Sequence, residues 1–146
     1  MLLYICLVLY TNHVVQLTDE SKKHSELKVE DLEIFLNKED HEYFTTHSKV
    51  CFEIIKRIYR RVLLGYDFGA IKVNQNRLII DGNHRYLAYE LAGIDYEIIA
   101  GCRSFSDPEY KLNTLNLVID EDWDYNRQDT RKFCTDDFLK NCIKRS

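Results

Sequence analysis

The amino-acid sequence predicts one α+β domain, with a small mixed sheet and helices packed around it. The chain has 146 residues, the size of one ordinary domain, and 45% of them are hydrophobic, which is enough for a core. Three patterns predict this class: a long amphipathic helix over residues 48–65, two short apolar strands over 70–80, and a strand, turn and helix over 77–93. Because no linker or internal repeat divides the chain, we expect residues 1–146 to form a single domain.

The first quarter of the chain is predicted to contain two strands and one helix. Residues 1–10 are all apolar or aromatic, which is typical of a buried strand, and residues 14–17 predict a second, shorter strand. The apolar run has no basic flank and is about half as long as a membrane-spanning helix, so neither a signal peptide nor a membrane anchor is expected. The apolar spacing over residues 27–36 favours a short amphipathic helix.

The clearest helix is expected to begin at the N-cap residue Ser48 and to end at Gly65 in a left-handed conformation. Its predicted buried stripe consists of apolar residues at helical spacing, namely Cys51, Ile54, Ile55, Ile58, Val62 and Leu63. Its opposite face carries four basic residues, Lys56, Arg57, Arg60 and Arg61. Such a row indicates either a solvated face, which is the commoner cause, or a contact surface for nucleic acid.

The middle of the chain predicts a β-hairpin, a helix and a returning strand. The hairpin strands are expected over residues 70–73 and 77–80, joined by asparagine-rich residues that tolerate a positive φ. A helix over 83–92 is closed by the glycine that follows it, and a strand over 95–100 is expected to return beside the hairpin.

Two further helices are predicted near the C-terminus. Asp107 is a suitable cap for the first of them, with Pro108 in its first position. Thr135 is the expected cap of the second, which would extend through Cys142.

The segment Asp81-Gly82-Asn83-His84-Arg85 joins the second hairpin strand to the following helix. The first N–H groups of a helix lack internal partners and carry partial positive charge, so such an end binds phosphate readily. Gly82 allows close approach of the backbone, Arg85 can donate to two phosphate oxygens, and Asn83 and His84 add donors. The alternative is that Asp81 and Asn83 only cap the helix while Arg85 pairs with a carboxylate.

Residues 66–101 resemble the core of the ParB/sulfiredoxin superfamily. There, a β-hairpin leads to a G-x-x-R turn, an alanine-rich helix follows, and a strand returns after a glycine; the matching turn here is Gly82 to Arg85. The resemblance implies that Gly82 and Arg85 hold the phosphates of a nucleotide. The flanking segments fit the superfamily only loosely.

Asn83 separates this chain from two branches of that superfamily. Sulfiredoxins have a catalytic cysteine at the corresponding position, so sulfinic acid reduction is not expected here. ParB proteins that bind CTP typically have glutamate at this position. ParB proteins also carry a helix-turn-helix region after this core. The 46 residues that follow Ala100 are too few for such a region, so chromosome partitioning is not expected.

The pattern Asp-Gly-x-His-Arg is most similar to the branch that includes free serine kinases. In that branch the acidic residue before the glycine takes part in catalysis. The resemblance therefore implies that Asp81 is a general base or a carboxylate associated with Mg²⁺, and that His84 positions a phosphoryl oxygen. The alternative for Asp81 is that it ends the strand and caps the helix.

Two other patterns allow a metal site. Asp120, Glu121, Asp122 and Asp124 could together bind Mg²⁺, although an exposed acidic loop is the commoner cause of such a run. His47 and Cys51 have the i,i+4 spacing of some zinc ligands, but no second pair completes a site, which favours a structural cysteine.

Three functions are compatible with these residues. The first is an enzyme that binds ATP or another nucleotide together with Mg²⁺. It either transfers a phosphoryl group from the nucleotide or hydrolyses it. The second is a ParB-like nuclease that contacts DNA through the basic helix face, although the net charge of −4 argues mildly against a dedicated DNA binder. The third is a non-catalytic module that binds a nucleotide or a protein.

Five scattered cysteines without a C-x-x-C pair predict reduced thiols in a cytoplasmic protein.

Overall fold

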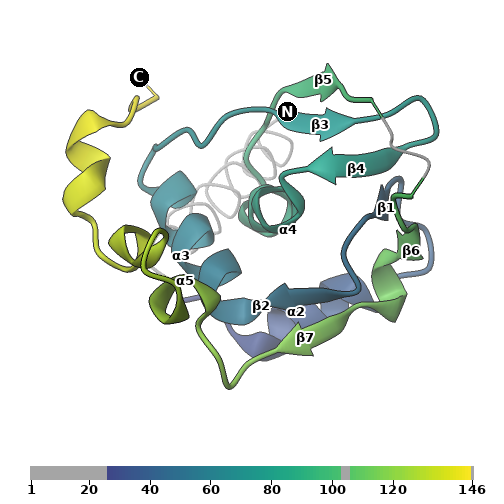
Figure 1. Ribbon diagram of the computed structural model, residues 1–146, viewed down its shortest axis with the longest axis horizontal. Helices are drawn as coiled ribbons and strands as arrows, with labels where there is room; N and C mark the ends of the chain where they lie inside the picture. Colours follow the sequence, from purple (N-terminus) through teal and green to yellow (C-terminus); the bar gives the residue numbers. More distant parts are fainter. Residues whose placement is uncertain (1–25, 103–105, 146) are drawn as a thin grey trace, which may run out of the picture.

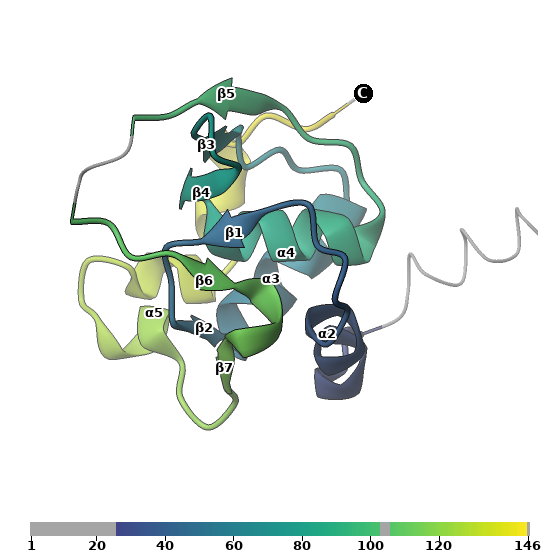
Figure 2. The ribbon, with the colours of Figure 1, turned by 90° about the vertical axis from the view of Figure 1, so that its right-hand side faces the viewer.

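The computed structural model describes residues 26–102 and 106–145, and Figures 1 and 2 show it from two sides. Its helices are α2 (Val29–Leu36), α3 (Phe52–Leu63), α4 (Asn83–Ala92) and α5 (Trp123–Asn126). Its strands are β1 (Phe44–Thr45), β2 (Lys49–Cys51), β3 (Ile71–Val73), β4 (Leu78–Asp81), β5 (Ile98–Ala100), β6 (Tyr110–Lys111) and β7 (Asn116–Val118). Three short 3₁₀ helices are η1 (Leu112–Thr114), η2 (Arg131–Cys134) and η3 (Asp137–Asn141). The predicted strands at residues 1–10 and 14–17 lie outside the described residues.

Within these ranges, five strands form a mixed sheet in the order β5-β3-β4-β1-β6, which confirms the α+β class. Strands β3 and β4 form the predicted hairpin. As expected, β5 returns beside it, where it pairs with β3 in the parallel direction. Strand β1 runs parallel to β4 and antiparallel to β6. A separate parallel pair, β2 and β7, lies on the other side of α4 from this sheet (Figure 1).

Helix α4 occupies the centre of the molecule, where it packs against α3 and beneath the main sheet (Figures 1 and 2). Its side chains Leu87, Ala88 and Tyr89 are fully buried, and each large apolar side chain buried in this way stabilises the fold by about 2 kcal/mol. The Tyr89 hydroxyl accepts a hydrogen bond from the Phe68 N–H and donates one to Asp67. These contacts fix α4 against the segment that precedes β3.

The long helix begins later than the sequence predicts. Residues 49–51 form β2 and pair with β7, and Phe52 is the first helical residue, so Ser48 is not the N-cap. Val50 and Cys51 are fully buried in this strand, and the tertiary pairing outweighs the local capping signal. The end of the helix is as predicted, because Gly65 follows it with a φ of 93°.

The hairpin turn also differs in detail from the prediction. The residue with positive φ is Arg77, at 60°, rather than an asparagine. Asn74 acts through its side chain instead, since its amide oxygen accepts hydrogen bonds from the N–H groups of Asn76 and Leu78. The asparagine thus closes the turn as a hydrogen-bond acceptor.

The predictions of two helices near the C-terminus are wrong. No helix begins at Pro108, because the chain continues as β6 and must stay extended to pair with β1. The predicted helix after Thr135 is replaced by the 3₁₀ helices η2 and η3. Arg61 donates to the carbonyl oxygen of Phe133 in η2 and to that of Thr135 between η2 and η3. No helix in the described ranges has the length and apolarity needed to cross a bilayer.

Candidate functional site

The turn at Gly82 requires a glycine. Its φ of 93° and ψ of 27° lie in the left-handed region, directly before the first residue of α4. A Cβ at this position would lie 3.0 Å from Nη2 of Arg85 and 3.0 Å from Cδ1 of Ile71. No side chain of the described residues caps α4, so Asp81 and Asn83 are not helix caps. The first N–H groups of α4 therefore keep their capacity to bind an anion.

Arg85 folds back over the Gly82 turn. Its Nη1 donates to the carbonyl oxygen of Phe68 at 2.6 Å, and its Nη2 donates to Asp81 at 3.0 Å. The Asp81 side chain is 58% exposed, and an ion pair this exposed contributes at most about 1 kcal/mol. A doubly charged phosphate can therefore compete with Asp81 for the guanidinium group.

His84 is a largely buried, neutral histidine at the first turn of α4. Its Nε2 accepts a hydrogen bond of 3.0 Å from the N–H of Cys51. Its ring packs edge-on against His47 and Trp123, with centroids 5.6 and 5.8 Å away. Burial, together with the nearby His47, lowers the pKa of His84 to about 4. Because Nε2 is an acceptor, the proton resides on Nδ1, so His84 can donate a hydrogen bond but brings no positive charge.

The side chain of Asn83 does not serve as a free donor for an anion. It is buried, and its amide group donates to the hydroxyl of Thr46 at 3.2 Å. The hydroxyl of Thr45 donates to its amide oxygen at 2.5 Å. Asn83 thus connects the start of α4 to the end of β1 and offers only its backbone N–H to a ligand.

A cavity of about 200 Å³ lies at this turn, lined by His47, Ile80, Asp81, Gly82, Asn83, His84 and Arg85. This volume suits a phosphate group but is smaller than most complete small-molecule sites. The structure thereby brings together every residue that the sequence singled out at the turn and adds His47. Burial lowers the pKa of His47, and the negative charge of Asp81 partly opposes that shift.

No pattern in the sequence predicts His47 at this site; its spacing from Cys51 indicated only a possible zinc ligand. It reaches the turn because β1 runs parallel to β4, so the two strands end at the same edge of the sheet. Cys51 instead donates its thiol to the carbonyl oxygen of Glu121. Among the described residues, no group of three or more histidine, cysteine, aspartate or glutamate side chains forms a metal site.

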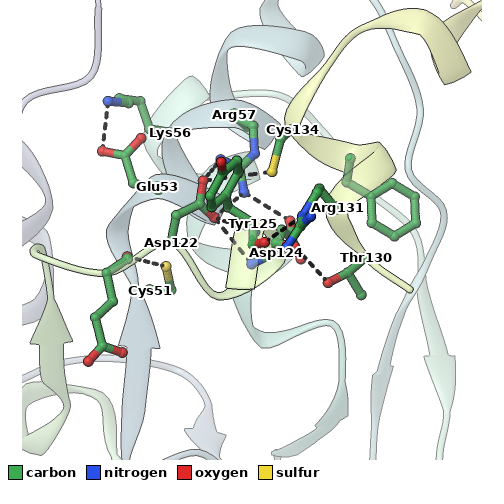
Figure 3. A network of polar contacts seen from close by, with 12 residues as sticks. Cys51, Glu53, Lys56, Arg57, Asp122, Asp124, Tyr125, Thr130, Arg131 and Cys134 are labelled. Atoms are coloured by element: carbon green, nitrogen blue, oxygen red, sulfur yellow. Dashed lines mark hydrogen bonds and ion pairs between the residues drawn. The ribbon is translucent and has the colours of Figure 1, made fainter. Parts of the chain in front are cut away.

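The basic residues of α3 do not form an open face. Arg57 is only 12% exposed and donates to both carboxylate oxygens of Asp122, at 2.6 and 2.8 Å, and to Asp124 at 2.9 Å (Figure 3). Burial lowers the pKa of Arg57, but the bonds to the two carboxylates outweigh it and hold this pKa above its usual value. Asp122 and Asp124 are thus arginine partners, and the exposed acidic loop expected from the sequence is wrong for these two residues.

The expectation of a solvated or nucleic-acid-binding face is also wrong at Arg61, which is 2% exposed. Its Nε donates to Asp136 at 3.0 Å, and Asp136 accepts two further bonds from Arg60. Lys56 pairs with Glu53 on the same helix. The amphipathic pattern could not reveal these contacts, because the acidic partners of the arginines come from the C-terminal segment, residues 122–141.

Comparison of the chain with models of known protein families, with curated proteins and with solved structures gives no match. The order β3, β4, α4, β5 agrees with the element order that the ParB/sulfiredoxin resemblance implies. The likeness to this superfamily rests on the sequence motif of residues 66–101 alone.

Proposed function

We propose that this protein binds a nucleotide through its phosphates at the Gly82 turn and transfers or hydrolyses a phosphoryl group. One observation supports the proposal most: the uncapped start of α4 lines a cavity together with the guanidinium group of Arg85. Helix N–H groups, partial positive charge and a forked cation are the features that bind phosphate. The resemblance to nucleotide-binding proteins of the ParB/sulfiredoxin type points to the same ligand class.

The residues at the turn suggest specific roles. Arg85 would bind two phosphate oxygens, and the Nδ1–H of His84 would donate to a third. Once Arg85 binds the phosphate, Asp81 is available to take the proton from an acceptor hydroxyl or water. The acceptor oxygen then forms its bond to phosphorus while the bond to the leaving phosphate oxygen breaks, and the nucleoside diphosphate departs.

Mg²⁺ is part of this proposal. Mg²⁺ in such sites is commonly held by one or two carboxylates together with substrate phosphates, so the alternative role for Asp81 is to hold Mg²⁺ instead of acting as the base. Bound there, Mg²⁺ would neutralise phosphate charge. A nucleotide-using role also fits the cytoplasmic location expected from the sequence.

The two other hypotheses receive less support. A ParB-like nuclease would need the α3 face for DNA, and three of its four basic residues are bound to carboxylates of the C-terminal segment. A non-catalytic module would use the same turn and would differ from the proposed enzyme only in the absence of turnover. The first experiment therefore has to separate binding from turnover.

Calorimetry with ATP, ADP, CTP and GTP in the presence of Mg²⁺ tests the proposal. We expect saturable binding. Arg85→Ala should weaken it by about tenfold to a hundredfold, because one or two charge-assisted hydrogen bonds to the phosphates are lost. Arg127→Ala is the matched control, since Arg127 is 67% exposed and its side chain pairs with Asp129, away from the Gly82 turn. No binding, or binding that Arg85→Ala leaves unchanged, would contradict the proposal.

Phosphate release by the wild type and by Asp81→Asn then separates enzyme from module. We expect Asp81→Asn to retain nucleotide binding and to lose turnover. Binding without any phosphate release or transfer in the wild type would identify a non-catalytic module.

A further inference from the structure

A second cavity adjoins the Gly82 turn. Its volume is about 560 Å³, which is within the range of complete small-molecule sites. Its walls include three phenylalanines, Phe68, Phe133 and Phe138, and two isoleucines of α3, Ile54 and Ile58. These apolar walls suit a flat, largely apolar group.

The two cavities meet at Asp81 and Arg85, which line both of them. The Arg85 guanidinium group is fixed at this boundary, because it donates to the carbonyl oxygen of Phe68 on one side and to Asp81 on the other. A ligand with an anionic end at the Gly82 turn and a flat end among the phenylalanines would therefore extend past Arg85.

Arg57 adds a polar group to the larger cavity. Its Nη1 and Nη2 groups are held by Asp122 and Asp124, which fixes the guanidinium plane (Figure 3). Its Nε is buried and has no hydrogen-bond partner among the described residues. Because this Nε has less than 1 Å² of accessible surface, Arg57 contributes to the cavity wall as a rigid, ion-paired side chain and not as a free donor.

The aromatic wall is preorganised by the buried Arg61. Its Nη2 donates to the carbonyl oxygens of Phe133 and Thr135, at 2.7 and 3.0 Å, and its guanidinium group lies 4.7 Å from the centre of the Phe138 ring. The rings of Phe133 and Phe138 pack edge to face with centroids 5.2 Å apart. Rings fixed in this way lose little entropy when a ligand binds between them and the helix.

We propose that this second cavity binds the nucleoside part of the nucleotide, with the base between the α3 isoleucines and the phenylalanines of the C-terminal segment. The inference rests on the proposed function, because it assumes that the phosphates bind at the Gly82 turn. It assigns a ligand-binding role to the segment over residues 131–141, which lies beside α3 (Figure 1).

The test compares ATP with inorganic tripolyphosphate, which carries the phosphates without a nucleoside. The variant Ile54→Trp fills the second cavity, and Ile34→Trp places the same ring at a position that is 68% exposed on α2. Calorimetry in the presence of Mg²⁺ measures both ligands on the wild type and on each variant. Thermal unfolding shows whether each variant folds. If Ile54→Trp does not fold, Ile54→Ala is measured in its place.

We expect the wild type to bind ATP at least tenfold more tightly than tripolyphosphate. Ile54→Trp should reduce ATP affinity to the level of tripolyphosphate and leave tripolyphosphate binding unchanged, whereas Ile34→Trp should alter neither. Ile54→Ala should weaken ATP binding several-fold and leave tripolyphosphate binding unchanged. Equal affinities of the two ligands for the wild type, or Ile54 variants that leave ATP binding unchanged, would overturn the inference while leaving the phosphate site intact. If neither ligand binds, the proposed function fails and this inference fails with it.

Discussion

The backbone N–H of Cys51, next to the start of α3, donates a hydrogen bond of 3.0 Å to Nε2 of His84 in the first turn of α4. This bond connects the β2–α3 junction to the helix that carries the candidate site. It requires an unprotonated Nε2, because an imidazolium has only donors. Burial and the neighbouring His47 lower the pKa of His84 to about 4, in agreement with this requirement.

We therefore expect the free energy of unfolding to decrease as the pH falls from about 6.5 to about 4. In this window the unfolded chain, with an ordinary histidine pKa of 6.5, binds a proton that folded His84 excludes. Above that window His84 contributes no pH dependence, and below it the loss is complete, at about 3 kcal/mol. His84→Gln offers Cys51 an acceptor that does not titrate. Urea unfolding at neutral pH and near pH 4.5 should show a smaller loss for His84→Gln, and equal losses would contradict the assignment.

Gly82→Ala should destabilise the protein by about 2–3 kcal/mol. The positive φ costs about 1 kcal/mol for a residue with a Cβ, and the new atom would also meet Arg85 and Ile71 at 3.0 Å. Gly93→Ala is the matched control, because Gly93 also has a positive φ but open space around its Cβ position. Denaturant midpoints should show the larger loss for Gly82→Ala. Equal losses would mean that the close approach of Arg85 adds nothing.

Arg61→Leu should destabilise the protein by about 2 kcal/mol. The change leaves the carbonyl oxygens of Phe133 and Thr135 without their donor and removes one partner of Asp136. Lys56→Leu changes a basic residue on the same helix that pairs with Glu53 near the surface, and should shift stability by less than about 0.5 kcal/mol. Thermal unfolding distinguishes the two variants, and similar shifts would show that Arg61 does not hold the C-terminal segment.

The sequence predicted the fold best where glycines and periodic apolar residues lie close together. The hairpin, the Gly82 turn, α4 and the returning strand β5 all depend on local signals within about thirty residues of one another. Strands β1, β2 and β6 were not predicted, because each has only two or three residues and pairs with a strand that is distant in the sequence. The pairing of Lys49 with Asn116, for example, has no local signature in the sequence.

The candidate site was predictable only in part for the same reason. The pattern from Asp81 to Arg85 is contiguous, so its role at a helix start could be inferred. By contrast, Arg57 meets Asp122 across 65 positions of sequence, and its pairing depends on tertiary packing alone. The amphipathic pattern of α3 consequently indicated exposed arginines where the structure has ion pairs.

We expect no saturable binding of duplex DNA at roughly physiological salt. DNA affinity depends on cations that are free to displace counterions from phosphates, and on α3 the arginines already bind carboxylates. Arg60 is the most exposed of these arginines, at 51%, so Arg60→Ala is the sensitive variant. Fluorescence anisotropy over a salt series should detect no difference between wild type and Arg60→Ala. Salt-sensitive binding whose slope decreases by about one in Arg60→Ala would instead establish a DNA contact there and favour the nuclease hypothesis.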